Sequence, residues 1–380
     1  DNGYKVYLGD GAQIVPPSDA EISALIDAAP LDVTLASIDD PAIEQLSPML
    51  VGGYVAWAAS VRHRPEITGV RVASTALHGV GGDLLRRALK AAGFPEPIVV
   101  AEQQEPDPDF PTISRPNPEE PGAMDRVIAL AVEQGAAIAL ATDPDADRLG
   151  VAIPTRAGDW RRLTGDEIGW LLAEHALTHT AGDDRLVVTT LVSSSMLERI
   201  AAHHGVHHLE TFTGFKWIAR AILDHPEWRF VFGYEQALGY LVSTRPLDKD
   251  GISASVAMVE VASLAAHEGV TVEDRLDAIR ARYGDIVTGE CSLPMDPRRA
   301  TTVVQRLVDS PPVSLVGRRL TDRQSLAAAG RVRLRCGEVR VQIRPSGTEP
   351  KVKVYVELEV GDPEPFLDAM AAWLSPDPEP

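Results

Sequence analysis

The hydrophobic residues change their spacing along the chain, and this change constrains the possible folds most. Short, mainly apolar runs at residues 70–74, 98–101 and 137–142 alternate with helical patterns. Apolar strands separated by helices are typical of a largely parallel sheet that helices cover. Between residues 332 and 360, apolar and polar residues instead alternate with a period of two. That pattern predicts an antiparallel sheet with one solvated face.

These patterns divide the 380 residues into four parts. We expect an incomplete α/β piece at residues 1–64, followed by two mixed α/β domains at residues 65–181 and 182–290. We expect an antiparallel α+β domain at residues 291–380. The predicted fold class is therefore α/β, with several domains and a C-terminal α+β domain.

Local signals place some of the helix starts and loops. Ser18 and Thr164 are each followed three residues later by a glutamate, which is the pattern of a capping box at a helix start. Residues 104–121 are rich in proline and acidic residues and are expected to form a loop. The glycine-rich segment at residues 75–82 lacks the spacing of a phosphate-binding loop. We interpret it as packing between a strand and a helix.

The net charge excludes some classes of partner. The chain has 36 basic and 55 acidic residues, for a net charge of −19. So acidic a chain argues against binding to nucleic acid or to an anionic membrane surface, and no stretch reaches the ~20 apolar residues of a membrane span. Its two cysteines, Cys291 and Cys336, make no disulfide framework and fit a reducing cytoplasm. Any anionic ligand must therefore meet local positive charge.

The most specific motif is a cluster of aspartates after the apolar run at residues 137–142. Asp143, Asp145 and Asp147 are spaced two residues apart, and Arg148 follows them. In a tight loop, carboxylates at this spacing can converge on one hard divalent cation. The neighbouring arginine suggests that the cation also meets a phosphate. The alternative is an acidic turn in which the arginine is only a counterion.

A second motif lies between two alternating strands of the last domain. Its residues offer an anion backbone N–H groups, hydroxyls and positive charge. They are Arg344, Ser346, Gly347, Thr348 and Lys351. This is a candidate site for a phosphorylated ligand, and the alternative is a tight turn.

Three weaker motifs become informative only together. Glu235 lies between two glycines at a strand end, which suits recognition of sugar hydroxyls. Thr213, Gly214 and Lys216 follow another expected strand, and Lys249 precedes a helix. Each motif alone would more often be structural than functional.

Together the motifs resemble the α-D-phosphohexomutase superfamily, which contains phosphoglucomutases, phosphomannomutases and their phosphopentomutase relatives. The resemblance covers nearly the whole chain and follows the family's order. It implies a magnesium loop at Asp143, Asp145 and Asp147, and a sugar-specificity loop at Glu235 and Ala237. It also implies a loop for the distal phosphate between Arg344 and Lys351. Thr213, Gly214, Lys216 and Lys249 correspond to the family's further substrate contacts.

The resemblance also implies an activity. The family interconverts hexose 1-phosphate and hexose 6-phosphate through a phosphoserine and a 1,6-bisphosphate, so that Mg²⁺ and a glucose 1,6-bisphosphate-type activator are expected cofactors. Glucose is the favoured sugar here, and mannose is the next. The match places Lys5 as a general acid/base with a lowered pKa and Arg148 beside it at the catalytic centre.

Two departures from the family pattern leave alternatives open. Ala237 stands where the family often has serine, which puts the choice of sugar in doubt. The family's Ser-His-Asn motif does not occur in the 380 residues, so the nucleophile is expected on a missing N-terminal segment just before Asp1. The alternatives are a phosphopentomutase, a phosphosugar-binding protein without the serine, and a metal-dependent phosphatase.

Overall fold

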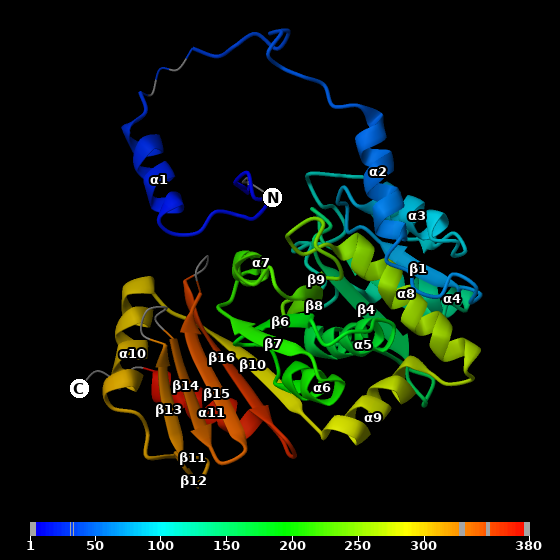
Figure 1. The fold of residues 1–380 in the computed structure, drawn as a ribbon. Coiled ribbons are helices and arrows are strands. Elements are labelled where there is room, and N and C mark those ends of the chain that lie inside the picture. The colour runs from blue at the N-terminus through cyan, green and yellow to red at the C-terminus, as the bar shows by residue number, and fades with distance from the viewer. Residues whose placement is uncertain (1–4, 31, 33, 327–330, 347–349, 376–380) are drawn as a thin grey trace. The chain divides into compact units, whose positions relative to one another are not determined.

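A computed structural model describes residues 5–30, 32, 34–326, 331–346 and 350–375 (Figure 1). The chain forms two compact units, one of residues 1–190 with 200–277 and the other of residues 191–199 with 278–380. Within the described residues, no helix combines the length and the hydropathy that a membrane span requires.

The first unit contains a five-stranded sheet in the order β2-β1-β3-β4-β5. Its strands are β1 (Val72–Thr75), β2 (Ile98–Val99), β3 (Ile138–Thr142), β4 (Leu149–Pro154) and β5 (Trp160–Arg162). The first three strands are parallel, and β4 and β5 are antiparallel additions. Strands β1, β2 and β3 overlap the three apolar runs, so the strands predicted there are confirmed. Helices α3 (Gly82–Ala91) and α4 (Asp125–Gln134) connect them, together with the short 3₁₀ helix Ala101–Gln103.

A second sheet of the same unit has the order β7-β6-β8-β9. Its strands are β6 (Arg185–Thr190), β7 (His207–Thr211), β8 (Arg229–Glu235) and β9 (Gly239–Leu241). Helices α5 (Gly165–Thr178), α7 (Phe215–Asp224) and α8 (Gly251–His267) contact its strands. Helices α6 (Met196–His204) and α9 (Val272–Tyr283) each contain residues of both units. Helix α8 is buried from residue 251 to 265 and contacts β3 and β4 of the first sheet as well as β9 of the second. This one helix therefore joins the two sheets (Figure 1).

The two predicted capping boxes have different outcomes. Thr164 accepts a hydrogen bond from the N–H of Glu167, whose side chain accepts one from the N–H of Thr164, as predicted for the start of α5. The box predicted at Ser18 is wrong, because α1 (Ser18–Ala28) already includes Ser18 and its cap position is Pro17. A proline has no hydroxyl with which to cap. Residues 104–121, all described, contain neither helix nor strand, as expected.

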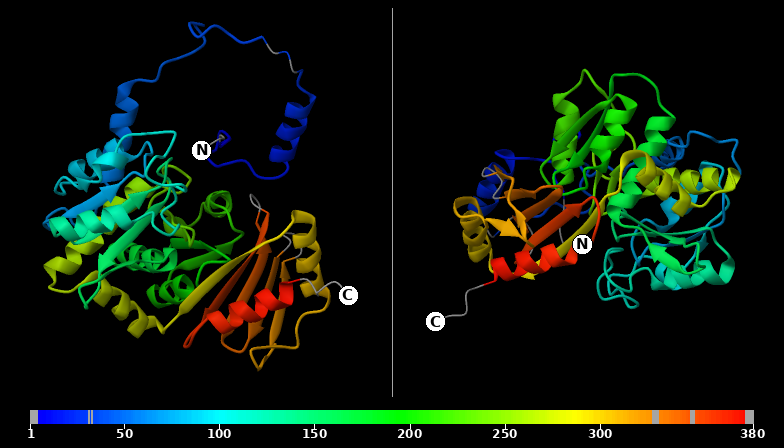
Figure 2. Two further views of the ribbon diagram at one scale, coloured as in Figure 1. Left: turned by 180° about the vertical axis from the view of Figure 1, so that it is seen from behind. Right: turned by 90° about the horizontal axis from the view of Figure 1, so that it is seen from below.

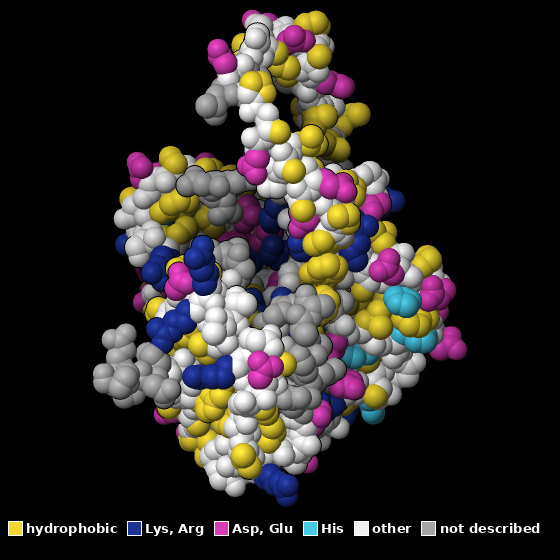
Figure 3. All heavy atoms as spheres, turned by 90° about the vertical axis from the view of Figure 1, so that its left-hand side faces the viewer, with side chains coloured by type: hydrophobic (Ala, Val, Ile, Leu, Met, Phe, Trp, Pro, Cys, Tyr) yellow, Lys and Arg dark blue, Asp and Glu magenta, His cyan; other side chains and the backbone are white. Residues whose placement is uncertain are grey.

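The N-terminal part of the first unit exposes an unusual amount of apolar surface. It contains α1 and α2 (Pro48–Ala59), and none of the described residues Ser18–Ala28 is buried. Leu35, Ile38 and Met49 are each more than 80% exposed. Hydrophobic side chains are visible on the part of the molecule that projects at the top of Figure 3. Packing therefore contributes little to the stability of α1.

The second unit is built on an antiparallel sheet in the order β10-β16-β15-β14-β13. Its strands are β10 (Val287–Pro294), β13 (Asp322–Leu326), β14 (Arg331–Cys336), β15 (Val339–Pro345) and β16 (Lys351–Leu358). A small ladder pairs β11 (Ser314–Leu315) with β12 (Arg318–Arg319). Helices α10 (Pro297–Asp309) and α11 (Glu364–Leu374) pack against the alternating apolar side chains of this sheet (Figure 2).

The opposite face of this sheet corrects one expectation. It was predicted to be solvated, yet Arg333, Arg340 and Gln342 on this face are buried. Residues 191–199 cover them. Arg340 donates a hydrogen bond of 2.7 Å to the carbonyl of Ser193, and Gln342 donates one to the carbonyl of Leu191. The period-two pattern shows which side chains share a face, but a segment remote in sequence decides whether polar side chains meet solvent.

Candidate active site

The three aspartates of the predicted metal loop converge. Asp143 follows β3 directly, the chain turns at Ala146, and β4 begins at Leu149. One carboxylate oxygen from each of Asp143, Asp145 and Asp147 lies within 4.8 Å of the others. The turn depends on Ala146, whose φ of 58° lies in the left-handed region that residues other than glycine rarely adopt.

Neighbouring segments hold this turn by close backbone contact. The N–H of Val80 donates to the carbonyl of Pro144 at 2.8 Å. A Cβ on Gly79 would lie 2.4 Å from Pro144 Cα, and one on Gly81 would lie 2.5 Å from Ala146 Cβ. The glycine-rich segment therefore does more than pack a strand on a helix. Its glycines leave the space that the metal loop occupies.

The donor set fits a hard divalent cation such as Mg²⁺. All three side chains offer carboxylate oxygens, the ligands that Mg²⁺ prefers. Oδ1 of Asp147 is buried and has no hydrogen-bond partner among the described residues, so it is available to a metal. Burial, together with the charges of Asp147 and Asp145, raises the pKa of Asp143 to about 7. Three carboxylates this close favour a bound cation because they repel one another.

Three basic side chains contact the same loop. Lys249 Nζ lies 2.6 Å from Asp147 Oδ2, and Lys5 donates to the same oxygen. Arg148 Nε lies 3.5 Å from Asp143 Oδ2. Burial acts to raise the pKa of Asp147, but the ammonium groups of Lys249 and Lys5 outweigh burial and lower it.

The lowered pKa expected for Lys5 depends on the charge of a neighbouring Mg²⁺ and stays a prediction, and the protein groups alone act in the opposite direction. Burial acts to lower this pKa, but the hydrogen bond to Asp147 and the charges of Asp147, Asp248 and Asp145 outweigh burial and raise it. Burial or nearby positive charge lowers the pKa of a lysine, but here the attraction of three carboxylates is the larger effect.

The predicted sugar loop lies beside the metal loop. Glu235 ends β8 and is buried, and its Oε1 accepts a hydrogen bond of 3.1 Å from the N–H of Gly214. Ala237 is half-buried in the turn before β9. The turn is tied to β4, because the N–H of Leu149 donates to the carbonyl of Leu238 at 3.0 Å. Glu235 is therefore fixed next to the aspartates.

The remaining predicted contacts from the first unit belong to the same region. Thr213 and Gly214 precede α7, and Lys216 lies in its first turn. The side chain of Lys249 passes Gly239, where an added Cβ would lie 2.7 Å from Lys249 Cδ. The structure thus brings the predicted metal loop (Asp143, Asp145 and Asp147), the predicted sugar loop (Glu235 and Ala237), Lys5 and Lys249 together within one unit.

The predicted phosphate loop lies in the second unit between β15 and β16. Arg344 Nη2 donates to the hydroxyl of Tyr355 at 3.0 Å, and the N–H of Ser346 donates to the carbonyl of Lys351 at 2.8 Å. Gly347 and Thr348 lie outside the described residues. Arg344 thus lies at the end of β15, Ser346 directly after it and Lys351 at the start of β16, and their binding of phosphate stays a prediction.

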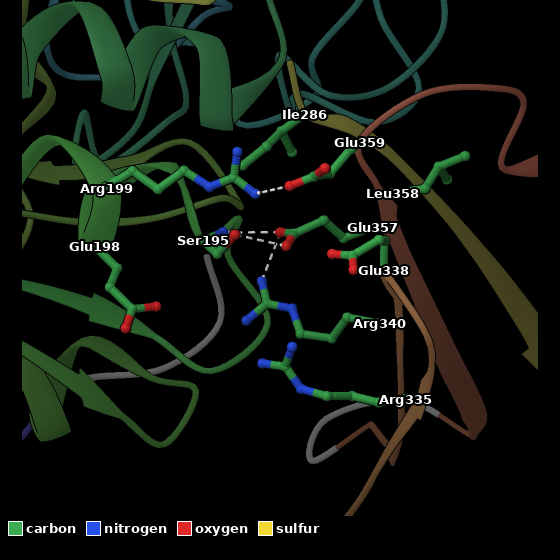
Figure 4. Close-up of a pocket in the computed structure, with 10 residues that line it drawn as sticks. All are labelled: Ser195, Glu198, Arg199, Ile286, Arg335, Glu338, Arg340, Glu357, Leu358 and Glu359. Atoms are coloured by element: carbon green, nitrogen blue, oxygen red, sulfur yellow. Dashed lines mark hydrogen bonds and ion pairs between the residues drawn. The ribbon is translucent and has the colours of Figure 1, made fainter. Parts of the chain in front are cut away.

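The second unit also has a polar pocket of about 170 Å³ that the sequence did not predict (Figure 4). Glu357 accepts hydrogen bonds from the N–H and hydroxyl of Ser195 at 2.8 and 2.7 Å, and it pairs with Arg340 at 2.6 Å. Arg199 pairs with Glu359 at 2.6 Å. These contacts attach residues 191–199 to the sheet.

Comparison with known proteins agrees with this arrangement. Three profiles of phosphoglucomutase/phosphomannomutase match: alpha/beta/alpha domain II over residues 54–158, alpha/beta/alpha domain III over residues 164–283, and the C-terminal domain over residues 315–364. The "Probable phosphomannomutase" of Haemophilus influenzae is 38% identical over 96% of this chain and 76% of its own length. The chain belongs to the phosphoglucomutase/phosphomannomutase family. The resemblance noted from the motifs is thereby confirmed.

Other members of the family carry different names. The human phosphopentomutase is 38% identical over 76% of this chain, and the human glucose 1,6-bisphosphate synthase is 35% identical over 82%. The chain spans about half the length of these two proteins, at 50% and 54%. A solved phosphoglucomutase/phosphomannomutase family protein from Burkholderia thailandensis has a TM-score of 0.65 at 20% identity, over 86% of this chain and 64% of that one. It confirms the multi-domain α/β fold.

Sequence reasoning missed several residues that shape the site of this family member. Tyr54 donates to Asp250, and Glu119 lies 3.9 Å from Arg148. Gly79 and Gly81 pack against the metal loop. The sequence contains no local signal for Tyr54, because its partner lies 196 residues away. The sequence shows the glycines themselves, but it does not show that they pack against Pro144 and Ala146.

Proposed function

We propose that the protein is a Mg²⁺-dependent phosphosugar mutase that interconverts hexose 1-phosphate and hexose 6-phosphate, with glucose favoured over mannose. One observation carries this proposal. Three carboxylates, three basic side chains and the buried Glu235 converge within one unit, which suits a ligand with a metal, a phosphate and hydroxyls. The substrate, its bisphosphate activator and a cytoplasmic location belong to the proposal.

The proposed roles follow from the contacts. Asp143, Asp145 and Asp147 would hold Mg²⁺, which supplies positive charge where a phosphoryl group is transferred. Arg148 neutralises the same group from the side of Asp143, and Lys249 orients it. Glu235 accepts hydrogen bonds from sugar hydroxyls, aided by the loop of Ala237.

The remaining roles concern the proton and the second phosphate. Lys5 donates a proton from its ammonium to the oxygen released by transfer. Arg344, Ser346 and Lys351, with Gly347 and Thr348, bind the phosphate that is not reacting. Because the 380 residues lack the expected serine motif, we assign the phosphoserine to polypeptide outside them.

The names of the relatives are consistent with this reaction, and they also favour a second candidate function. The relatives' names include phosphomannomutase, phosphopentomutase and glucose 1,6-bisphosphate synthase. A solved N-acetylphosphoglucosamine mutase of Aspergillus fumigatus, with a TM-score of 0.54 at 18% identity over 85% of this chain and 69% of that one, is described in complex with GlcNAc-6P and magnesium. A phosphopentomutase is the second candidate, since the human enzyme of that name has the same 38% identity as the phosphomannomutase, over 76% instead of 96% of this chain.

The test is ³¹P NMR on the protein expressed from its full open reading frame, with Mg²⁺, a trace of glucose 1,6-bisphosphate and single sugar 1-phosphates. We expect glucose 1-phosphate to convert to glucose 6-phosphate, and Glu235→Gln to lower kcat/KM at least tenfold. Conversion of ribose 1-phosphate alone would favour the phosphopentomutase. Release of inorganic phosphate alone would indicate a phosphatase. Binding without conversion would indicate a phosphosugar-binding protein.

A further inference from the structure

Two tyrosine–aspartate pairs flank Lys249. Tyr7 donates a hydrogen bond to Asp248 on one side. On the other side, the hydroxyl of Tyr54 lies 3.1 and 2.9 Å from the two carboxylate oxygens of Asp250. Both aspartates are buried, at 7% and 5% exposed. A buried carboxylate needs hydrogen bonds to offset its lost hydration. Asp250 receives them from Tyr54 and from the first turn of α8, and that turn contacts the metal loop.

Asp250 fixes the start of α8. Its Oδ1 accepts hydrogen bonds from the N–H groups of Ile252 and Ser253, both at 2.9 Å, as an N-cap residue does. Its own N–H donates to the carbonyl of Tyr240 at 2.9 Å. With Tyr54 as a further partner, the position and direction of the first turn of α8 are set from several sides.

The first turn of α8 in turn contacts the metal loop. The N–H of Gly251 donates to the carbonyl of Ala146 at 3.0 Å. The contact is so close that a Cβ on Gly251 would lie 2.2 Å from the carbonyl oxygen of Arg148. Ala146 is the residue in the left-handed region between Asp145 and Asp147. A hydrogen bond to its carbonyl therefore helps to keep the turn on which the convergence of the aspartates depends.

We propose that Asp250, held by Tyr54, is a positioning residue for the metal loop. Its hydrogen-bond partners are Tyr54, Tyr240 and the first turn of α8. It acts through the N-terminal turn of α8 on Ala146, so that α2, which carries Tyr54, and the metal site are mechanically linked. The inference rests on the proposed metal site, and its test measures metal binding directly rather than turnover.

The test compares metal affinity with stability in four proteins. Mn²⁺ affinity is measured by EPR titration and the melting temperature by calorimetry, for the wild type, Asp250→Ala, Asp250→Asn and Asp296→Ala. Asn caps a helix as well as Asp does, so we expect Asp250→Asn to bind Mn²⁺ as tightly as the wild type. We expect Asp250→Ala to weaken it about tenfold or more, because the cap and the partner of Tyr54 are both lost.

Asp296→Ala is the matched control. Asp296 caps α10 in the second unit and accepts from the N–H groups of Arg298 and Arg299 at 3.0 and 3.3 Å. Its loss should lower the melting temperature and leave Mn²⁺ affinity unchanged. If Asp250→Ala does not fold, Tyr54→Phe takes its place, with a loss of about threefold expected because only one hydroxyl is removed.

The outcomes separate this inference from the proposed function. Asp250→Ala or Tyr54→Phe binding Mn²⁺ as tightly as the wild type, with only the melting temperature lowered, would overturn the positioning role and leave the metal site intact. A wild type that does not bind Mn²⁺ would overturn the metal site and this inference together.

Discussion

At the scale of single residues, the aspartates and their partners differ in how far the sequence could predict them. Asp143, Asp145 and Asp147 are neighbours in sequence, so a tight loop after a strand is enough to bring their oxygens together. Lys249 reaches Asp147 across 102 residues and Lys5 across 142. Their proximity could be expected only from the family resemblance. The raised pKa of Lys5 follows from which charges surround it, and only the structure shows those charges.

Asp147→Asn should lower Mn²⁺ affinity by at least about tenfold, or about 1.4 kcal/mol. The substitution removes one charge from the three-carboxylate cluster and leaves Lys5 and Lys249 without their shared partner. EPR titration of free Mn²⁺ measures the effect. Asp109→Asn, in the exposed acidic loop, is the control and should bind as the wild type does. Equal affinities of all three proteins would contradict the proposed metal site.

At the scale of elements, close backbone contacts decide how the loops of the site are placed. Gly79, Gly81 and Gly251 each leave no room for a Cβ because a segment of the metal loop passes them. Gly165 has the same role for the sugar loop at the start of α5. Local propensity would favour almost any residue over glycine in a helix. The packing of one element on another outweighs that preference here.

Gly165→Ala and Gly53→Ala form a pair of opposite predictions. An added Cβ at Gly165 would lie 1.7 Å from the carbonyl oxygen of Gln236, whereas at Gly53 in α2 it would meet no atom within 4 Å. We expect Gly165→Ala to lower the free energy of unfolding by about 2–3 kcal/mol through overpacking. Gly53→Ala should raise it by about 0.5–1 kcal/mol through helix propensity.

Urea denaturation measures both changes. Gly165→Ala matching or exceeding the stability of Gly53→Ala would show that the sugar loop does not pack on α5 as described.

At the scale of the whole molecule, a buried carboxylate connects segments that are far apart in sequence. Glu260 of α8 accepts hydrogen bonds from the backbone N–H groups of His63 and Arg64, and Nε2 of His175 in α5 lies 2.8 Å from it. Burial acts to raise the pKa of Glu260, but the bonds from His175, His63 and Arg64 outweigh burial and lower it to about 2. Burial lowers the pKa of His175. The first unit is therefore sensitive to acid at this point.

The free energy of unfolding should decrease as the pH is lowered below 7, because His175 and Glu260 both have lower pKa values in the folded chain than in the unfolded chain. His175 binds a proton more readily in the unfolded chain, so its contribution is lost as pH falls below its ordinary pKa of 6.5. Glu260 is ionised more readily in the folded chain, so its contribution of up to about 3 kcal/mol is lost as pH falls from about 4.5 toward 2.

Urea denaturation at a series of pH values measures this dependence. Glu260→Gln should be less stable than the wild type at pH 7 and lose less stability between pH 5 and 3. Glu133→Gln, at an exposed position of α4, should follow the wild type. Parallel pH profiles for Glu260→Gln and the wild type would refute the assignment.

The sequence by itself determined the properties that depend on neighbouring residues. Apolar runs predicted β1 and β3, alternation predicted the antiparallel sheet, and local spacing predicted the aspartate cluster, because each pattern acts within a few residues. Tertiary structure alone decided that α8 joins two sheets and that Tyr54 and Asp250 lie behind the metal loop. It also decided that residues 191–199 cover a polar sheet face. The contacts of Tyr54 with Asp250 and of Arg340 with Ser193 join residues 196 and 147 positions apart, and no local preference specifies such a contact.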